Sequence, residues 1–184
     1  MDIEIVEKVL KGDIEAFSEL IDKYEKMIYN LAYRIFNNIS DAEDITQEVF
    51  IKAYKNIYKC EGKQSIKTWI YTIAYNTCID EVRKRKGKNN ISLDMDLEGE
   101  EDNFSLEIAS NEPTPENVLI QKEGLLEIEQ AINSLNEINK SLVFLRDIKG
   151  FSYNEISEIM GLNIGTVKSR LNRARNTLKN ILKI

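Results

Sequence analysis

Both prolines of this 184-residue chain, Pro113 and Pro115, lie at the end of one acidic segment. Residues 89–121 contain nine acidic residues and no lysine or arginine, and the stretch 94–102 has no sustained helical period. High charge with few large apolar side chains cannot offset the entropy lost on ordering. The remaining chain lacks proline and is dominated by helix formers. We therefore expect an all-α fold of two small helical domains, 1–88 and 116–184, joined by a flexible acidic linker at 89–115.

Capping signals and apolar periodicity predict the helices of the first domain. Asp13 precedes a stripe of apolar residues spaced three and four apart, which predicts a helix that continues to Ile35. Ser40 and Glu43 have the spacing of a capping box, which predicts that a second helix starts there. Ser65 is expected to open a long third helix that ends in the basic run 83–88.

The second domain shows a similar series of caps. Thr114 and Pro115 form a cap followed by proline at the first helical position, which predicts a helix to about Ile132. Asn136 is expected to cap the next helix, and Gly150 to stop it. Ser152 and Glu155 form another capping box in the segment 151–175. In the same segment, Gly161 is a turn residue and Asn163 precedes the last helix.

The segment 151–175 predicts a helix-turn-helix, because a short helix, a tight turn and a second helix with a basic outer face follow one another. Apolar residues would lock the two helices together. Lysine and arginine can reach phosphates or guanine edges, asparagine can pair with adenine, and the amide of Thr166 at the helix N-terminus can bind a phosphate. The outer face would comprise Thr166, Lys168, Ser169, Arg170, Asn172, Arg173 and Asn176.

The charge distribution supports nucleic-acid binding although the net charge is −6. Residues 67–88 hold six basic residues against two acidic ones, and residues 164–184 hold six basic residues and no acid. Basic segments of this kind release counterions when they meet phosphates. A solvated helix face is the alternative interpretation of each segment.

Three segments of the sequence resemble those of a known family. The segment 151–175 looks like the carboxy-terminal DNA-binding region of bacterial sigma factors, and the closest group is the extracytoplasmic-function (ECF) sigma factors. Residues 41–50 resemble the family's core-polymerase-binding helix, and residues 68–77 resemble its promoter-melting helix. Three motifs in the expected order are a specific match. The resemblance implies a specificity subunit that binds core RNA polymerase, directs it to promoter DNA and opens the duplex for transcription initiation.

The resemblance also implies two DNA contacts. The second domain would read the minus-thirty-five element through Lys168, Ser169, Asn172 and Arg173, with Arg146 reaching phosphate. The first domain would capture the unpaired minus-ten strand, with Asn76 at a flipped base and the loop 60–67 forming part of its pocket.

Residue chemistry supports a strand-binding role for the long helix, because a melted strand exposes base faces that stack on aromatic or planar groups near cations. Trp69 shares a face with Ile73 and is expected in the core, whereas Tyr71 and Tyr75 lie nearer the polar face. Lys67, Arg83 and Arg85 are the cations expected to bind this strand.

The acidic helix that starts near Asp41 needs a partner other than DNA, because its carboxylates would repel phosphates. Its polar face comprises Asp41, Asp44, Gln47, Glu48 and Lys52. In the family this face meets the clamp helices of the polymerase's largest subunit, and the flap of the polymerase is a further expected partner. One Asp–Glu pair is a weak metal site, so no metal is expected.

Several features exclude other classes. The chain has no histidine, two cysteines without Cys-x-x-Cys spacing, an acidic N-terminus and no apolar run near the roughly 20 residues of a membrane span. We expect a cytoplasmic protein that is not an enzyme, uses no cofactor and does not insert into a membrane. A conventional helix-turn-helix regulator of duplex DNA remains the alternative, and an enzyme acting on DNA is disfavoured. The family often pairs with an anti-sigma factor, although no residue here identifies one.

The sequence departs from the family pattern at three positions. Ile164 replaces a proline often found before Gly-Thr-Val, Asn136 replaces a proline that often opens the preceding helix region, and Cys60 stands where an aromatic residue is common. These departures affect promoter preference more than the class of protein.

Overall fold

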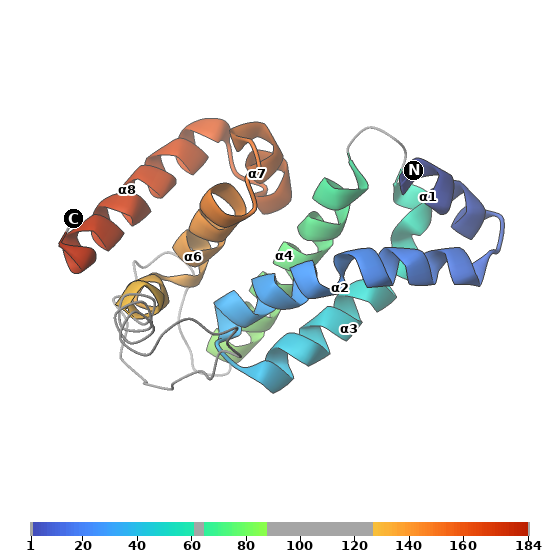
Figure 1. Cartoon of the computed structure of the whole chain (residues 1–184), viewed down its shortest axis with the longest axis horizontal. Helices are drawn as coiled ribbons and strands as arrows, with labels where there is room; N and C mark the ends of the chain where they lie inside the picture. The colour runs from blue at the N-terminus through green and yellow to red at the C-terminus, as the bar shows by residue number, and fades with distance from the viewer. Residues whose placement is uncertain (1, 61–64, 88–126, 184) are drawn as a thin grey trace, which may run out of the picture.

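The computed structural model describes residues 2–60, 65–87 and 127–183, and within these ranges every regular element is a helix (Figure 1). The linker 89–115, loop residues 61–64 and the capping pair Thr114 and Pro115 lie outside the described residues. The all-α prediction is confirmed. The bounds of the elements are α1 Asp2–Leu10, α2 Ile14–Phe36, α3 Ile39–Asn56, a 3₁₀ turn η1 Ile57–Lys59, α4 Ile66–Gly87, a helical segment at 127–133, α6 Glu137–Val143, a π-helical turn η2 Phe144–Ile148, α7 Tyr153–Met160 and α8 Ile164–Leu182.

Most of the predicted caps are confirmed. Asp13 accepts a hydrogen bond from the Ala16 amide, and Asn136 accepts one from the Asn139 amide. Ser65 accepts one from the Thr68 amide at the start of α4. In each case a side-chain oxygen satisfies an amide that has no partner in the first turn of its helix.

The prediction that Ser40 caps the second long helix is wrong. Asn38 is the cap: its side-chain oxygen accepts a hydrogen bond from the Asp41 amide at 3.1 Å, and α3 begins at Ile39. Asn37 ends α2 in the left-handed conformation, with φ 50°. The chain therefore changes direction between α2 and α3 at Asn37 and Asn38. Ser40 already lies inside the first turn of α3.

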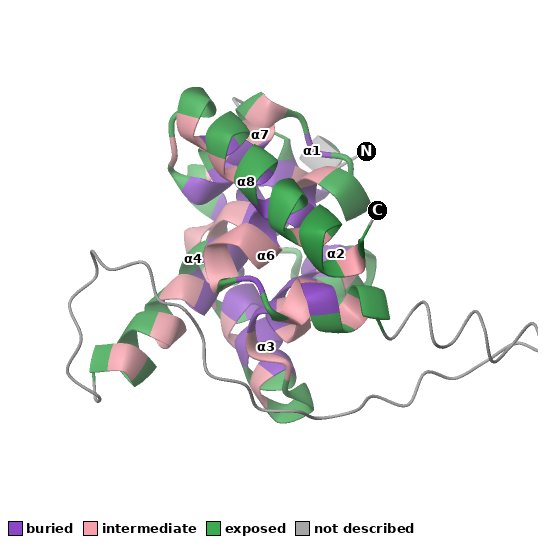
Figure 2. Ribbon diagram, turned by 90° about the vertical axis from the view of Figure 1, so that its left-hand side faces the viewer, coloured by how far each residue is buried: buried purple, intermediate pink, exposed green. Residues whose placement is uncertain are grey.

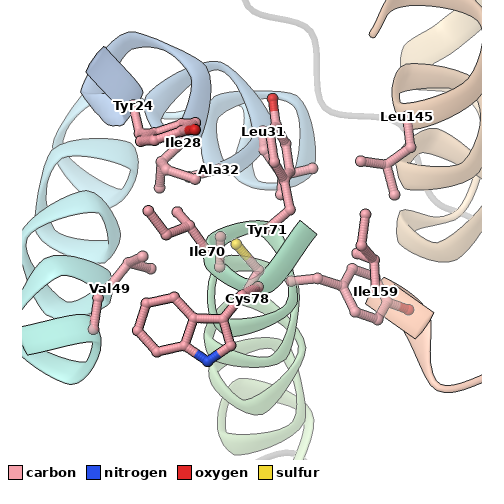
Figure 3. Packing of buried hydrophobic residues seen from close by; sticks show 14 of the residues in the cluster. Tyr24, Ile28, Leu31, Ala32, Val49, Ile70, Tyr71, Cys78, Leu145 and Ile159 are labelled. Carbon is pink, nitrogen blue, oxygen red and sulfur yellow. The ribbon is translucent and has the colours of Figure 1, made fainter. Parts of the chain in front are cut away.

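Helix α4 lies between the two halves of the molecule. Figure 1 shows α1 and α3 on one side of it and α6, α7 and α8 on the other, while α2 runs across it and also contacts α6. Side chains from α2, α3, η2 and α7 gather around α4 in Figure 3, including Ile28, Val49, Leu145 and Ile159. The buried residues form one continuous cluster through both halves, shown in purple in Figure 2.

Helix α1 was not predicted from the sequence. It buries Ile5, Val6 and Val9 against the rest of the first half, where it packs on α2 and η1. In the described part of the chain, no helix has both the length and the apolar composition that crossing a membrane requires.

Candidate nucleic-acid interface

The α7–α8 pair has the geometry predicted for a helix-turn-helix. The Ser152 hydroxyl accepts a hydrogen bond from the Glu155 amide, and the Glu155 carboxylate accepts one from the Ser152 amide at 2.8 Å, so both halves of the capping box are present. The Ser152 hydroxyl also donates to the Glu155 carboxylate at 2.7 Å, and this bond, followed by the one from the Ser152 amide, lowers the pKa of Glu155. Gly161 ends α7 at φ 63°, a conformation that glycine adopts without steric cost.

The turn into α8 is fixed by Asn163. Its side-chain oxygen accepts hydrogen bonds from the Thr166 amide at 2.7 Å and from the Thr166 hydroxyl at 2.9 Å. The Ser157 hydroxyl donates to the Leu162 carbonyl across the same turn. The hydroxyl of Thr166 therefore has a partner within the protein, and the helix begins correctly without the proline that the family often has at Ile164.

The predicted outer face of α8 is the face that the structure leaves open. Val167, Leu171 and Ala174 are buried, so the opposite side of the helix faces outward. That side carries no acidic residue. Its exposed members are Lys168, Ser169, Asn172, Arg173 and Asn176, whereas Thr166 and Arg170 are half-buried.

Arg146 lies in the π-helical turn η2, and its guanidinium contacts other residues of the second half. Its guanidinium donates to the Phe151 carbonyl at 2.7 Å and lies 4.7 Å from the centre of the Tyr153 ring. It clamps the turn that joins η2 to α7. To contact a phosphate as predicted, Arg146 would have to reach it from this position or give up its contacts with Phe151 and Tyr153.

The predicted strand-binding residues of α4 divide into two groups. Asn76 and Arg83 are exposed, and Arg83 forms an ion pair with Asp80 at 3.5 Å. Tyr71 and Tyr75 are 0% and 6% exposed, so neither ring is open to solvent. Trp69 is buried, as predicted.

The burial of the two tyrosines is caused partly by the second half of the chain. The Tyr71 ring meets the Phe151 ring edge-on at 4.9 Å between centroids, and the Lys67 ammonium lies 4.2 Å from the centre of Phe151. Burial raises the pKa of Tyr75 to about 12, although Arg170 and Arg83 are close enough to oppose that shift. The Arg170 side chain of α8 therefore lies near Tyr75 of α4.

The hydroxyl of Tyr71 has no hydrogen-bond partner among the described residues, and burial raises the pKa of this phenol. A buried hydroxyl without a partner costs about 1–3 kcal/mol. Burial of a side chain as large as Phe151 contributes about 1.5–3 kcal/mol. The cost of the unpaired hydroxyl therefore offsets part of what the burial of the two rings contributes.

Sequence reasoning did not identify Phe151 as a contact of α4. Phe151 precedes the Ser152 cap, and a hydrophobic residue at that position normally packs on the fourth residue of its own helix, here Ile156. A contact with the distant helix α4 has no such local pattern in the sequence.

The acidic face of α3 is arranged as predicted. Ile45, Val49 and Ala53 are buried, and Asp44 and Gln47 are exposed on the other side. Figure 2 shows α3 lying apart from α7 and α8. The helix thus offers its polar side to a partner.

Two residues predicted on the polar face of α3, Lys52 and Asp41, already form contacts with α4. Lys52 pairs with Glu48 at 2.7 Å, and its ammonium donates to the Thr77 hydroxyl on α4. Asp41 accepts two hydrogen bonds from Arg85, each at 2.8 Å, which lowers the pKa of the Asp41 carboxyl. A residue expected to bind polymerase and one expected to bind DNA therefore neutralise each other.

No group of three or more metal-ligating side chains occurs within the described ranges. The half-buried Cys60 and the buried Cys78 are both free, and burial raises the pKa of Cys78 to about 12. The part of the minus-ten loop at 61–64 lies outside the described residues.

Comparison with known proteins gives consistent matches over both halves. Residues 20–88 match the family described as Sigma-70 region 2, and residues 125–178 match Sigma-70, region 4. The ECF RNA polymerase sigma factor SigW of Bacillus subtilis is 36% identical over 179 residues, covering 97% of this chain and 95% of that protein. The ECF RNA polymerase sigma-E factor of Escherichia coli K12 is 36% identical over 182 residues, covering 97% of this chain and 93% of that protein.

Two solved structures share the fold. The sigma factor RpoE, in complex with the anti-sigma factor NepR from Bartonella quintana, matches with a TM-score of 0.71 and 24% identity, covering 93% of this chain and 99% of that one. CnrH, in complex with the cytosolic domain of CnrY, matches with a TM-score of 0.69 and 18% identity, covering 99% of this chain and 97% of that one.

Proposed function

The chain belongs to the ECF group of RNA polymerase sigma factors, and from that premise we propose how its helices divide the work of transcription initiation. A sigma factor binds core RNA polymerase, directs it to promoters and promotes opening of the DNA. We assign duplex recognition to α8, strand capture to α4 and polymerase binding to α3. The corresponding domains are 1–88 and 116–184, with the linker 89–115 between them.

The observation that carries the assignment of α8 is its exposed, acid-free face next to a complete turn. Lys168, Ser169, Asn172 and Arg173 all project from this face. A helix of this kind fits the major groove, where arginine and lysine read guanine and asparagine reads adenine. These four residues would contact the minus-thirty-five element, and Thr166 would offer its amide to a phosphate.

Helix α4 supports strand capture through its exposed polar residues. Asn76 is open to solvent on α4, and the basic run that ends this helix includes Arg83 and Arg85. An amide can pair with the edge of an unstacked base, while cations hold the backbone. Lys67, Tyr71 and Tyr75 would join this surface once α7 no longer covers them.

Helix α3 supports polymerase binding because its exposed acids suit a basic protein surface and repel DNA. Asp44 and Gln47 would contact the clamp helices of the largest subunit directly, and Glu48 and Lys52 would contribute as a pair. Charged complementarity of this kind gains specificity and association rate more than raw affinity.

We base the proposed localisation and the remaining proposed partners on the family. Sigma factors are not enzymes, and we propose no catalytic residue and no cofactor here. We place the protein in the cytoplasm, with the polymerase. An anti-sigma factor is a further proposed partner, since one similar fold was solved with an anti-sigma factor bound.

Transcription with purified core polymerase tests the proposal. We expect added chain to start transcription at specific sites of its own genome, mapped by the 5′ ends of the transcripts. A fluorescent promoter-binding assay with and without core polymerase separates a sigma factor from a conventional regulator. Tight sequence-specific binding by the isolated chain, with no effect of polymerase, would favour the regulator.

A further inference from the structure

Three elements of the second half meet at one aromatic ring. Tyr153 is the first residue of α7, and its half-buried ring packs against the buried cluster. The Arg146 guanidinium of η2 lies 4.7 Å from the centre of this ring, and the Lys168 ammonium of α8 lies 5.7 Å from it. Both distances are within the range of about 6 Å in which a cation is attracted to the face of an aromatic ring. Sequence reasoning did not identify Tyr153 as part of the site.

The two cations at this ring belong to the same proposed DNA surface. Arg146 is expected to reach a phosphate, and Lys168 is exposed on the outer face of α8. Two like charges held near each other repel, and the electron-rich face of the Tyr153 ring offsets that repulsion. Stacking occupies the face of a guanidinium and leaves its in-plane N–H groups able to donate. One of these groups donates to the Phe151 carbonyl at 2.7 Å.

The ring also reduces what the two cations lose when DNA binds. A long side chain that is immobilised only on binding loses rotamer entropy, which lowers affinity, whereas a side chain already held against a ring loses less. The backbone at Tyr153 is itself fixed, because the capping box between Ser152 and Glu155 forms around it. The ring is therefore a stable surface on which cations from η2 and α8 are brought together.

We infer that Tyr153 is a positioning residue for duplex recognition: its ring holds Arg146 and Lys168 in the arrangement in which both meet the DNA. This inference rests on the role proposed for α8. Tyr153 acts through the two cations and does not itself have to touch the DNA. The property that matters is the face of the ring, and the hydroxyl is not required.

Variants of Tyr153 in the holoenzyme test this role, with a fluorescein-labelled duplex that carries a promoter mapped from transcript 5′ ends. Tyr153→Leu removes the ring and is expected to weaken binding about two- to fivefold for each cation that it releases. Tyr153→Phe keeps the ring and is expected to bind nearly as tightly as the wild type. Equal losses in the two variants would overturn the inference, because the hydroxyl rather than the ring face would then be responsible.

The salt dependence of binding separates this role from a purely structural one. Each phosphate contact contributes about 0.9 to the slope of log affinity against log salt concentration. Tyr153→Leu changes no charge, yet it should reduce that slope by about 1 because Arg146 is no longer held at its phosphate. An unchanged slope would overturn the inference.

Phe144→Leu is the matched control for the salt dependence. It removes a buried ring whose centre lies 5.2 Å from the Lys149 ammonium, and Lys149 is a cation of the same half outside the proposed contacts. We expect this variant to keep the wild-type slope. The same change of slope in Phe144→Leu and Tyr153→Leu would show a general loosening of the domain and would overturn the inference.

A double-mutant cycle with Lys168→Ala shows whether the ring acts through the lysine. The loss caused by Tyr153→Leu should be smaller in the Lys168→Ala background, because one of the two cations is already absent. Equal losses in both backgrounds would overturn the inference. Arg173→Ala distinguishes the two proposals: if it weakens binding and Tyr153→Leu does not, only the positioning role fails. If neither variant weakens binding, the role of α8 fails as well.

Proton NMR of the free wild-type chain tests the geometry without any substitution. A methylene group above an aromatic ring is shifted upfield by the ring current. We expect the Cε protons of Lys168 to lie upfield of those of Lys179, an exposed lysine on the same helix. Coincident shifts would overturn the inference even if Tyr153→Leu does not fold.

Discussion

Single ion pairs in this structure have consequences that depend on pH. Arg85 holds the Asp41 carboxyl through two hydrogen bonds, and these lower the pKa of Asp41 below its unfolded value near 4. A lowered pKa in the folded state means that the ionised carboxyl stabilises the fold above about pH 4. That stability is lost as the pH falls through the folded pKa.

We therefore expect Asp41→Asn to lower the free energy of unfolding at neutral pH and to have a smaller effect as the pH falls below about 4. Urea unfolding of both proteins across this range measures the difference. Because only one carboxyl is changed, the difference isolates Asp41 from other titrating groups such as Glu155. A difference that persists unchanged at pH 3 would show that the carboxylate is not its source.

Arg173 offers a test of duplex recognition at one residue. Arg173→Ala is expected to weaken binding of the polymerase holoenzyme to minus-thirty-five DNA by roughly 1–3 kcal/mol. Arg175→Ala is the matched control, because Arg175 points elsewhere and pairs with Asp147 within the domain. Promoter occupancy measured by footprinting should fall for the first variant only; equal losses would remove Arg173 from the proposed contacts.

Caps show how far single residues can be predicted from sequence. Asp13, Asn136, Ser152 and Asn163 were identified because each has a short polar side chain just before an apolar repeat. Asn38 was missed because Ser40 and Glu43 also satisfy the capping-box pattern two residues later. The choice between two good caps depended on where Asn37 ended α2, and that position is set by packing.

At the scale of elements, α3 carries exposed polar side chains, Asp44 and Gln47, on the side opposite its buried residues. Asp44→Arg together with Glu48→Arg should lower affinity for core polymerase, because two arginines would then face the basic polymerase surface that the carboxylates are proposed to complement. Glu7→Arg with Glu15→Arg provides the same change of charge at exposed positions outside the matched regions. Co-purification with core polymerase is the measurement, and equal retention of both variants would contradict the role of α3.

Helix α4 allows strand capture to be separated from duplex binding. Asn76→Ala should leave closed-complex formation unchanged and reduce opening, because an exposed amide is lost from the strand-binding surface. Permanganate reactivity of unpaired thymines in the promoter measures opening. Asn154→Ala, an exposed asparagine on α7, serves as the control. Wild-type reactivity in Asn76→Ala would place the flipped base elsewhere.

The sequence patterns predicted where the helices lie better than they predicted which side chains of those helices are buried. The existence of α2, α4 and α8 follows from apolar spacing and caps, and their cores are as expected. Tyr71 and Tyr75 appeared to lie near a polar face because the periodicity of α4 describes only its contact with α2 and α3. Their second neighbour comes from residues 144–170, and no local pattern reveals a contact over that separation.

At the scale of the whole molecule, one buried cluster runs through both halves, and it should make them unfold together. Trp69 is the single tryptophan and reports on α4, whereas far-UV circular dichroism reports on all helices. We expect coincident urea midpoints from the two signals. Two separate midpoints in the wild-type chain would show that the halves are independent.

Phe151→Ala should separate these midpoints. Truncation of a buried phenylalanine costs about 3–5 kcal/mol, and here the loss falls on the second half and on its contact with Tyr71. Tyr58→Ala, which truncates an exposed aromatic ring in η1, should leave both midpoints nearly unchanged. A coincident transition in Phe151→Ala would mean that other contacts couple the halves.

The covered face of α4 also bears on how copies of this chain that are not bound to polymerase interact with DNA. Unwound DNA occurs wherever chromosomes are copied or repaired, and an open cationic helix with aromatic rings would bind there without regard to sequence. We expect a chain that folds those rings inward to bind such places more weakly than a chain that exposes them.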